Sequence, residues 1–273
     1  MSNPYQVYLV SDSTGETLDR IFLALKAQFK NFKYQTHHFS FTRTENQILK
    51  IIETCQKKNS IILFTVVDNK LSRFLQEEAN KYKIPCFDVL GDLILSFSKL
   101  LNQKASYLPS GQHILNEEYY NRIEAIQFTM NHDDGNSISD IQKSDIILLG
   151  VSRTSKTPTS IYLANKGYKV SNIPLVNENS IPEKLKKNNV KKCIIGLTAE
   201  PERLVEIRKN RLNSLKEIQN TNYVDIEKIQ KEVNQSKKTF QKYKWPTIDV
   251  SRKSVEETAA SVIKIFEISK HNV

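Results

Sequence analysis

A short apolar run followed by a polar loop and a helix, over residues 145–170, constrains the fold more than any other part of the chain. Four apolar residues run from Ile146 to Leu149, which is typical of a parallel strand covered on both faces. Pro158 then stands where the first turn of a helix tolerates proline, and Gly167 can supply the left-handed residue that ends a helix. The pattern predicts a strand–loop–helix unit of an α/β protein.

The loop between this strand and helix is the predicted phosphate-binding site. Backbone N–H groups and the positive end of the helix dipole meet there. The spacing matches G-x-x-x-x-G-K-S/T, except that Ser155 replaces the second glycine, and its β-carbon limits the positive-φ conformations that the loop can adopt. An ordinary turn with exposed polar residues is the alternative. The residues expected to bind phosphate are Gly150, Val151, Ser152, Arg153, Thr154, Ser155, Lys156 and Thr157.

Four side chains near this loop are candidates for chemistry. Lys156 is expected to reach the terminal phosphates and to offset charge during transfer, and Thr157 to ligate magnesium or a phosphate oxygen. Asp133 and Asp134 are adjacent carboxylates that could bind magnesium or accept a hydroxyl proton. A helix end closed by Gly135 is the plainer interpretation, although acidic groups suit the negative end of a helix dipole poorly. The candidate catalytic residues are Lys156, Asp133 and Asp134, and the candidate magnesium ligands are Thr157 and Asp134.

A second strand–loop–helix unit opens the chain. An apolar strand over 6–10 leads into a polar loop and then into a helix with apolar residues at helical spacing. The loop could form another anion site, with Asp12 facing a metal or a proton. Ser, Thr and Asp are also the preferred helix-capping residues, which is the alternative explanation. This second predicted phosphate site consists of Ser11, Asp12, Ser13, Thr14 and Thr17.

The order of the predicted elements indicates two α/β domains. Strands and helices alternate as far as residue 101, which favours a parallel sheet with helices on its faces. A proline, a serine and a glycine over 109–111 interrupt this pattern. We expect a Rossmann-like parallel-sheet domain over 1–105 and a P-loop-containing, kinase-like α/β domain over 106–273.

For several arginines the sequence leaves open whether they bind a ligand or partner or are exposed to solvent. Arg153 could bind phosphate through its forked guanidinium group, but arginines in loops are commonly solvated. Arg203, Arg208 and Arg211 are spaced to share part of a helix face. Such a face could hold an acidic partner, or it could simply be exposed to solvent.

Charge and composition narrow the class of partner and the compartment. Forty Lys and Arg against thirty Asp and Glu give a formal net charge of +10, which favours anionic partners. The excess is scattered and no basic and aromatic motif is interleaved, so we expect no nucleic-acid partner. Three distant cysteines suggest a reducing compartment. Without a signal-like start or an apolar window of ~18 residues, a cytoplasmic protein with no membrane partner is expected.

Several sequence motifs carry a family resemblance, and they occur in the same order over nearly the whole chain. They are SDSTGET from Ser11, HDDG from His132, GVSRTSKTPTSIYLA from Gly150, GLTAEPERLVEIRKNRL from Gly196 and WPTIDVSRKSVEETAAS near the end. Together they resemble the bacterial pyruvate, phosphate dikinase regulatory proteins. In the sister branch, which acts on phosphoenolpyruvate synthase, the loop resembles Gly-Val-Ser-Arg-Cys-Gly-Lys-Thr. The Thr154–Ser155 pair of this chain favours the dikinase branch.

The resemblance implies a bifunctional serine/threonine kinase and phosphorylase. One activity inactivates the dikinase by phosphorylating a threonine, with ADP as the phosphoryl donor. The other reactivates it by using inorganic phosphate to remove that group, which releases pyrophosphate. The resemblance places the nucleotide on the loop over 150–157 and makes the dikinase the protein partner. Magnesium is the expected metal, and a homodimer is one of the open oligomeric states.

Three alternatives stay open from the sequence. The same chemistry could act on phosphoenolpyruvate synthase. An ATP-dependent P-loop kinase for a small molecule would turn over without any target protein. A nucleic-acid-binding protein would account for the charge of +10, and it predicts salt-sensitive binding to nucleic acid.

Overall fold

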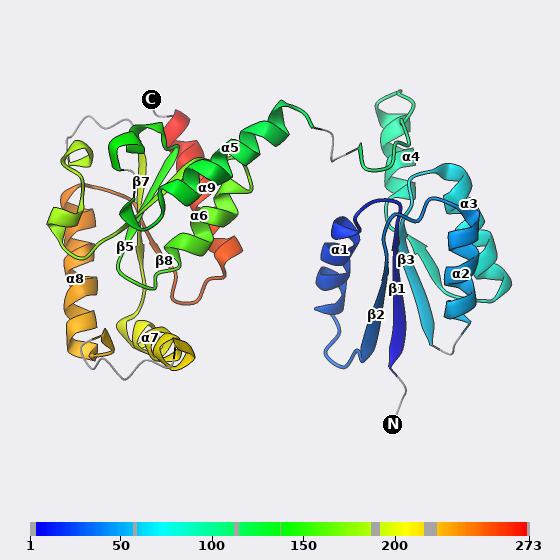
Figure 1. The fold of residues 1–273 in the computed structure, drawn as a ribbon, viewed down its shortest axis with the longest axis horizontal. Helices are drawn as coiled ribbons and strands as arrows, with labels where there is room; N and C mark the ends of the chain where they lie inside the picture. The colour runs from blue at the N-terminus through cyan, green and yellow to red at the C-terminus, as the bar shows by residue number, and fades with distance from the viewer. Residues whose placement is uncertain are drawn as a thin grey trace. The chain divides into compact units, whose positions relative to one another are not determined.

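The chain forms two compact units, which comprise residues 1–114 and 115–273 (Figure 1). The computed structural model describes residues 4–56, 59–111, 115–136, 138–186, 192–215 and 223–271. Each unit contains one four-stranded parallel sheet with helices on its faces. The predicted α/β class with two parallel-sheet domains is therefore confirmed. None of the helices in the described ranges is long and apolar enough to cross a membrane.

The sheet of the first unit has the strand order β2-β1-β3-β4. Its strands are β1 (Tyr5–Ser11), β2 (Tyr34–Phe39), β3 (Ser60–Thr65) and β4 (Cys86–Asp88). Helix α1 (Glu16–Lys26) covers one face, and α2 (Glu45–Cys55) and α3 (Asn69–Lys81) cover the other, while α4 (Gly91–Leu100) follows β4 (Figure 1). Helix α2 begins at Glu45 because Thr44 and Gln47 form a reciprocal capping box.

The sheet of the second unit has the order β6-β5-β7-β8. Its strands are β5 (Ile146–Gly150), β6 (Val170–Pro174), β7 (Cys193–Thr198) and β8 (Thr247–Asp249). All five residues of β5 are buried, as the apolar run predicted. The helices of this unit are α5 (Glu117–Asn131), α6 (Lys156–Ala164), α7 (Pro201–Leu215), α8 (Ile226–Lys242) and α9 (Val255–His271).

The two sheets share one topology. In each, the first strand pairs with both the second and the third, so the chain changes direction between β1 and β3 and again between β5 and β7. α/β proteins bind ligands beside such a switch point, outside the carboxyl ends of the strands. The 11–17 loop leaves β1 there and the 150–157 loop leaves β5 there. The two predicted phosphate sites therefore occupy equivalent positions in the two units.

Candidate functional site

The 150–157 loop holds two residues other than glycine in the left-handed region of backbone space. Arg153 has φ 72°, and Ser155 has φ 57° and ψ 24° as it precedes the first residue of α6. Ser155 therefore adopts the conformation that the usual second glycine would take. A non-glycine residue in that region costs on the order of 1 kcal/mol or more, so contacts around the loop must offset this strain.

Gly150 ends β5 at a point where no side chain fits. A β-carbon there would lie 2.6 Å from the Thr154 hydroxyl and 2.7 Å from the Leu197 carbonyl oxygen. The Thr154 side chain is fully buried, and its hydroxyl donates to the Val151 carbonyl 2.9 Å away. The loop therefore turns tightly against its own first residues and against β7.

Lys156 is a buried cation at the start of α6. Its side chain is 6% exposed, and Nζ donates to the Val151 carbonyl oxygen at 3.0 Å. Burial lowers the pKa of Lys156 to about 8, against the raising effect of the Asp134 and Asp133 charges. Among the ion pairs found in the described ranges, none involves Lys156. An anionic ligand would therefore stabilise its charged form.

Thr157 and Asp133 are brought together by the fold. The Thr157 hydroxyl donates to both oxygens of the Asp133 carboxylate, at 3.0 and 3.3 Å. Asn172, a buried residue of β6, donates to both partners and lies 3.0 Å from the Thr157 hydroxyl. The Asn172 Oδ1 atom is buried and has no hydrogen-bond partner among the described residues. This leaves a hard oxygen acceptor beside a hydroxyl and a carboxylate.

Asp134 has a different environment from its neighbour. It lies in a short turn after α5, has φ 51°, and is exposed. Its side chain lines a pocket of about 330 Å³ at the head of α6. The other residues that line this pocket are Ser152, Arg153, Ser155, Lys156, Thr157, Pro158, Pro174 and Ile207. Asp134 thus faces the space that a ligand would enter, whereas Asp133 is already engaged by Thr157.

Oxygen donors of the kinds that magnesium prefers lie at and beside this pocket. Carboxylate, amide and hydroxyl oxygens are the ligands that this ion prefers. Thr157 lines the pocket, Asp133 accepts from its hydroxyl, and Asn172 contacts both through its amide nitrogen. No group of three or more His, Cys, Asp or Glu side chains that could hold a metal occurs in the parts of the chain that the structure covers. A magnesium ion at Thr157 and Asp133 would take phosphate oxygens as further ligands.

A tyrosine and a buried arginine contact the loop from outside the predicted site. Arg208 of α7 is 1% exposed, so of the two alternatives left open for its helix face, exposure to solvent does not apply to this residue. Its guanidinium group pairs with Glu232 at 2.7 Å. Burial acts to raise the pKa of Tyr223, but hydrogen bonds from Ser152 and Arg153 and the nearby guanidinium charges outweigh it and lower that pKa.

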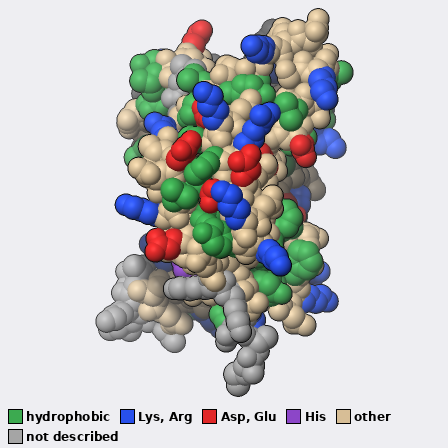
Figure 2. Space-filling model, turned by 90° about the vertical axis from the view of Figure 1, so that its right-hand side faces the viewer, with side chains coloured by type: hydrophobic (Ala, Val, Ile, Leu, Met, Phe, Trp, Pro, Cys, Tyr) green, Lys and Arg blue, Asp and Glu red, His purple; other side chains and the backbone are tan. Residues whose placement is uncertain are grey.

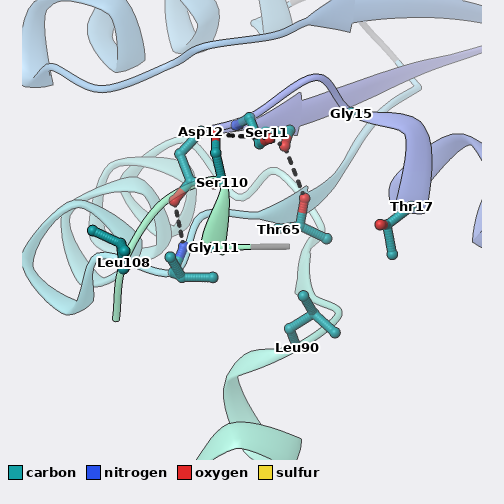
Figure 3. A pocket seen from close by; sticks show the side chains of 11 residues that line it. Ser11, Asp12, Gly15, Thr17, Thr65, Leu90, Leu108, Ser110 and Gly111 are labelled. Atoms are coloured by element: carbon teal, nitrogen blue, oxygen red, sulfur yellow. Dashed lines mark hydrogen bonds between the residues drawn. The ribbon is translucent and has the colours of Figure 1, made fainter. Parts of the chain in front are cut away.

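The predicted N-terminal site is also a real pocket, of about 170 Å³ (Figure 3). The hydroxyls of Ser11 and Thr65, at the ends of β1 and β3, lie 3.1 Å apart. Ser110 donates to the Ser13 hydroxyl at 3.0 Å. Asp12 is buried and accepts from the Val67 amide at 2.7 Å, and burial raises its pKa although this hydrogen bond opposes the shift.

The remaining predicted residues of this site lie at its edge. Thr17 lines the pocket, as Figure 3 shows. Thr14 is exposed, and its carbonyl accepts from the Ser40 hydroxyl at 2.8 Å. Arg43 was not predicted, but it donates to the Asp12 carbonyl at 2.9 Å and to the Ser110 hydroxyl at 3.2 Å. The structure thus adds a cation to the hydroxyls and the carboxylate of this loop.

Two further residues around the C-terminal pocket were missed in the sequence. Asn172 has a weak signal, because it is a polar residue within an apolar strand. Tyr223 has none, since it reaches the 150–157 loop only through the tertiary fold. Arg208 was singled out only as part of a helix face, and its contact with the loop likewise depends on the tertiary fold.

Comparison with known proteins identifies the family. Residues 7–263 match the model of the kinase/pyrophosphorylase family. A protein of Pelagibacter ubique (strain HTCC1062), named as a pyruvate, phosphate dikinase regulatory protein, is 70% identical over the whole of both chains. Proteins with the same name from Rhizorhabdus wittichii and Wolbachia are 44% and 43% identical, and each alignment covers 95% of this chain and 94% or 96% of the relative.

The family description is that of an enzyme that transfers phosphoryl groups. Both the family model and the relatives span nearly the full chain, which confirms the resemblance carried by the sequence motifs. The chain therefore belongs to the kinase/pyrophosphorylase family, whose members include the pyruvate, phosphate dikinase regulatory proteins.

Proposed function

We propose that this protein is a bifunctional regulator of pyruvate, phosphate dikinase. It phosphorylates a threonine of the dikinase with ADP, which inactivates the target, and it removes that group with inorganic phosphate. The names of the relatives support the identity of the partner. The observation that carries the proposal is the buried Lys156 ammonium at the head of α6, beside the Thr157–Asp133 pair and a pocket open to Asp134.

The geometry suggests separate roles for the two carboxylates. Asp134 faces the pocket and is the residue that we assign to the target hydroxyl. Its carboxylate takes the threonine proton as the threonine oxygen bonds to the β-phosphorus of ADP. The bond from that phosphorus to its bridging oxygen breaks, and AMP leaves. Lys156 and Arg153 offset the charge that develops on the phosphoryl oxygens.

We propose that magnesium binds at the Thr157 hydroxyl, which lines the same pocket. Thr157 and Asp133 would hold it, with Asn172 hydrogen-bonded to both, and it would supply charge compensation on the phosphate oxygens. The sequence assigned this role to Thr157 and Asp134. In the structure the Thr157 hydroxyl donates to Asp133, so we propose Asp133 in place of Asp134 as the second ligand.

The opposed reaction uses the same charge arrangement. An oxygen of inorganic phosphate bonds to the phosphorus of the phosphothreonine, the bond to the threonine oxygen breaks, and pyrophosphate leaves. The threonine oxygen regains its proton. We propose that the 11–17 loop helps to bind phosphate or phosphothreonine, because hydroxyls and a buried Asp12 line its pocket and the Arg43 guanidinium donates to two of the lining residues, Asp12 and Ser110. Ser13→Ala should then weaken the phosphate-dependent reaction and spare the ADP-dependent one.

The surface charge offers little support for a nucleic-acid-binding protein. On the face drawn in Figure 2, Lys and Arg side chains are interspersed with Asp and Glu. Nucleic-acid-binding surfaces concentrate positive charge on one face or along one helix. We therefore propose a protein partner and no nucleic-acid ligand. From the sequence we also propose a cytoplasmic location, and a homodimer is one proposed oligomeric state.

One incubation tests the proposed function. The pure protein is mixed with pyruvate, phosphate dikinase and either ADP or ATP, and phosphothreonine is detected on the dikinase. We expect phosphothreonine with ADP and none with ATP. Addition of inorganic phosphate should then remove the phosphoryl group and release pyrophosphate. Phosphoenolpyruvate synthase serves as the alternative target. ATP turnover in the absence of any target protein would instead identify a small-molecule kinase and overturn the proposal.

A further inference from the structure

The hydroxyl of Tyr223 lies against the strained part of the 150–157 loop. Arg153 Nε donates to this hydroxyl at 3.1 Å, and the Ser152 hydroxyl lies 3.4 Å from it. Arg153 is one of the two residues of this loop that hold a left-handed conformation without being glycine. Tyr223 thus contacts the loop where its backbone conformation is least favourable.

Arg208, which is buried, hydrogen-bonds to the backbone of both Ser152 and Tyr223. Its Nη2 atom donates to the Ser152 carbonyl oxygen and its Nη1 atom to the Tyr223 carbonyl oxygen, both at 3.3 Å. The guanidinium carbon also lies 4.9 Å from the centre of the Tyr223 ring. Glu232 of α8 pairs with the guanidinium group and holds it in place. One buried cation therefore joins the loop, the tyrosine and two helices.

These contacts can stabilise the loop although residue 155 is serine and not glycine. A phosphate loop with glycine at that position reaches the left-handed conformation without strain. This chain has serine there and a second left-handed residue at Arg153, so other interactions must favour the bent form. The contacts made by Tyr223 and Arg208 are of this kind, since they bind both the side chain and the backbone of the loop.

We propose that Tyr223, anchored by Arg208, is a positioning residue that keeps the 150–157 loop in its ligand-binding conformation. The side-chain contacts take over a task that the second glycine performs in other phosphate loops. This inference rests on the proposed function, in which the loop binds ADP. It predicts that the tyrosine hydroxyl matters because residue 155 is not glycine.

A double-mutant cycle on the full chain tests this coupling directly. ADP binding is measured by calorimetry for the wild type, Tyr223→Phe, Ser155→Gly and the double variant. Tyr223→Phe keeps the ring beside Arg208 and removes only the hydroxyl. We expect this change to weaken ADP binding by about threefold to tenfold, the effect of one or two lost hydrogen bonds. In the Ser155→Gly background the same change should have an effect of less than about twofold.

A matched control and three outcomes separate the explanations. Tyr243→Phe removes a hydroxyl that donates to Glu178 at 2.7 Å, beside the start of β8 and away from the loop, and should leave ADP binding unchanged. If the wild type binds no ADP, the proposed function fails. If it binds ADP and Tyr223→Phe binds equally well, the inference fails. An equal loss in both backgrounds would mean that Tyr223 contacts ADP itself, which would also overturn the positioning role.

Thermal unfolding of each variant accompanies these titrations. A Tyr223→Phe chain that unfolds at a lower temperature can still be compared in the two backgrounds, because the cycle subtracts any general effect on the fold. Restoration of ADP binding by Ser155→Gly supports the positioning role whatever the change in melting temperature. A loss of binding that follows the melting temperature alone, with no restoration, contradicts it.

Discussion

The ammonium group of Lys156 donates to the carbonyl oxygen of Val151, 3.0 Å away, within its own loop. A lysine that is 6% exposed is ordinarily paired with a carboxylate, because an unpaired buried charge is unfavourable. Here burial is the main cause that lowers the lysine pKa to about 8. A bound phosphate would supply the missing negative charge, so the loop holds this cation in a state that an anion stabilises.

ADP binding should weaken as the pH rises through about 8. In the ligand-free protein Lys156 has a pKa of about 8, so its ammonium form, which attracts phosphate, is lost above that pH. Above the pKa the affinity should fall by up to about tenfold per pH unit. Calorimetry from about pH 7 to about pH 9.5 measures this, with Lys156→Arg as the control because its charge persists over that range. An equal affinity of the wild type across this range would contradict the assignment.

Lys156→Met should stabilise the ligand-free protein at neutral pH. The pKa of Lys156 is lower in the folded state, about 8, than its ordinary value of 10.5, so the folded state binds this proton less well than the unfolded state does. Burial of the ammonium group therefore lowers the free energy of unfolding. This loss is complete below pH 8 and disappears as the pH rises to 10.5. We expect a gain of roughly 1 to 3 kcal/mol in urea unfolding at pH 7. A loss of stability would contradict this reasoning.

The two adjacent carboxylates should respond differently to amide substitution. Asp134→Asn keeps the size of an exposed side chain and removes the proposed proton acceptor, so ADP-dependent labelling should fall by about 10²- to 10⁴-fold without loss of stability. Asp133→Asn removes the negative charge and one of the two acceptor oxygens beside the Thr157 hydroxyl, and should raise the magnesium concentration needed for activity.

Both variants should be assayed in both reaction directions. Because the charge arrangement around Lys156 is proposed to act in both reactions, Asp134→Asn should impair the phosphate-dependent reaction as well. Full activity of either variant in both directions would remove that residue from the mechanism.

Gly150→Ala should destabilise the second unit. The added β-carbon would meet the Thr154 hydroxyl at 2.6 Å and the backbone oxygen of Leu197 at 2.7 Å, and the latter cannot move without shifting β7. Overpacking of this kind typically costs about 1 to 3 kcal/mol. Gly111→Ala is the matched control, since nothing lies within 4 Å of its added carbon. Equal unfolding midpoints for the two variants would contradict the close packing described for the loop.

Patterns that repeat locally in the sequence predicted the main elements. The apolar run over 146–149 became β5 because unbroken apolar residues need cover on both faces. Thr44 with Gln47 and Ser254 with Glu257 form capping boxes, a pattern that a sequence shows directly because it depends on residues three apart. Gly167, with φ 91°, follows α6 in the left-handed conformation as predicted.

The supporting contacts of the site could not be predicted in this way. Tyr223 is far from Ser152 in the sequence and reaches it only because α7 and α8 pack together. The spacing of Arg208 left open whether it binds an acidic partner or is exposed to solvent, and the fold buries it against Tyr223 and Glu232. The residue spacing of the loop also does not show what stabilises Ser155 in the conformation that glycine usually adopts. That answer depends on tertiary contacts, which a local pattern does not contain.

Transfer of label from ADP to the dikinase tests the central claim most directly. ADP labelled in its β-phosphate is incubated with pyruvate, phosphate dikinase and either the wild type or Lys156→Met, and Tyr243→Phe serves as the control. We expect labelled phosphothreonine with the wild type and with the control, and none with Lys156→Met, although that variant remains folded. Undiminished label transfer by folded Lys156→Met would contradict the assignment of the 150–157 loop as the catalytic nucleotide site.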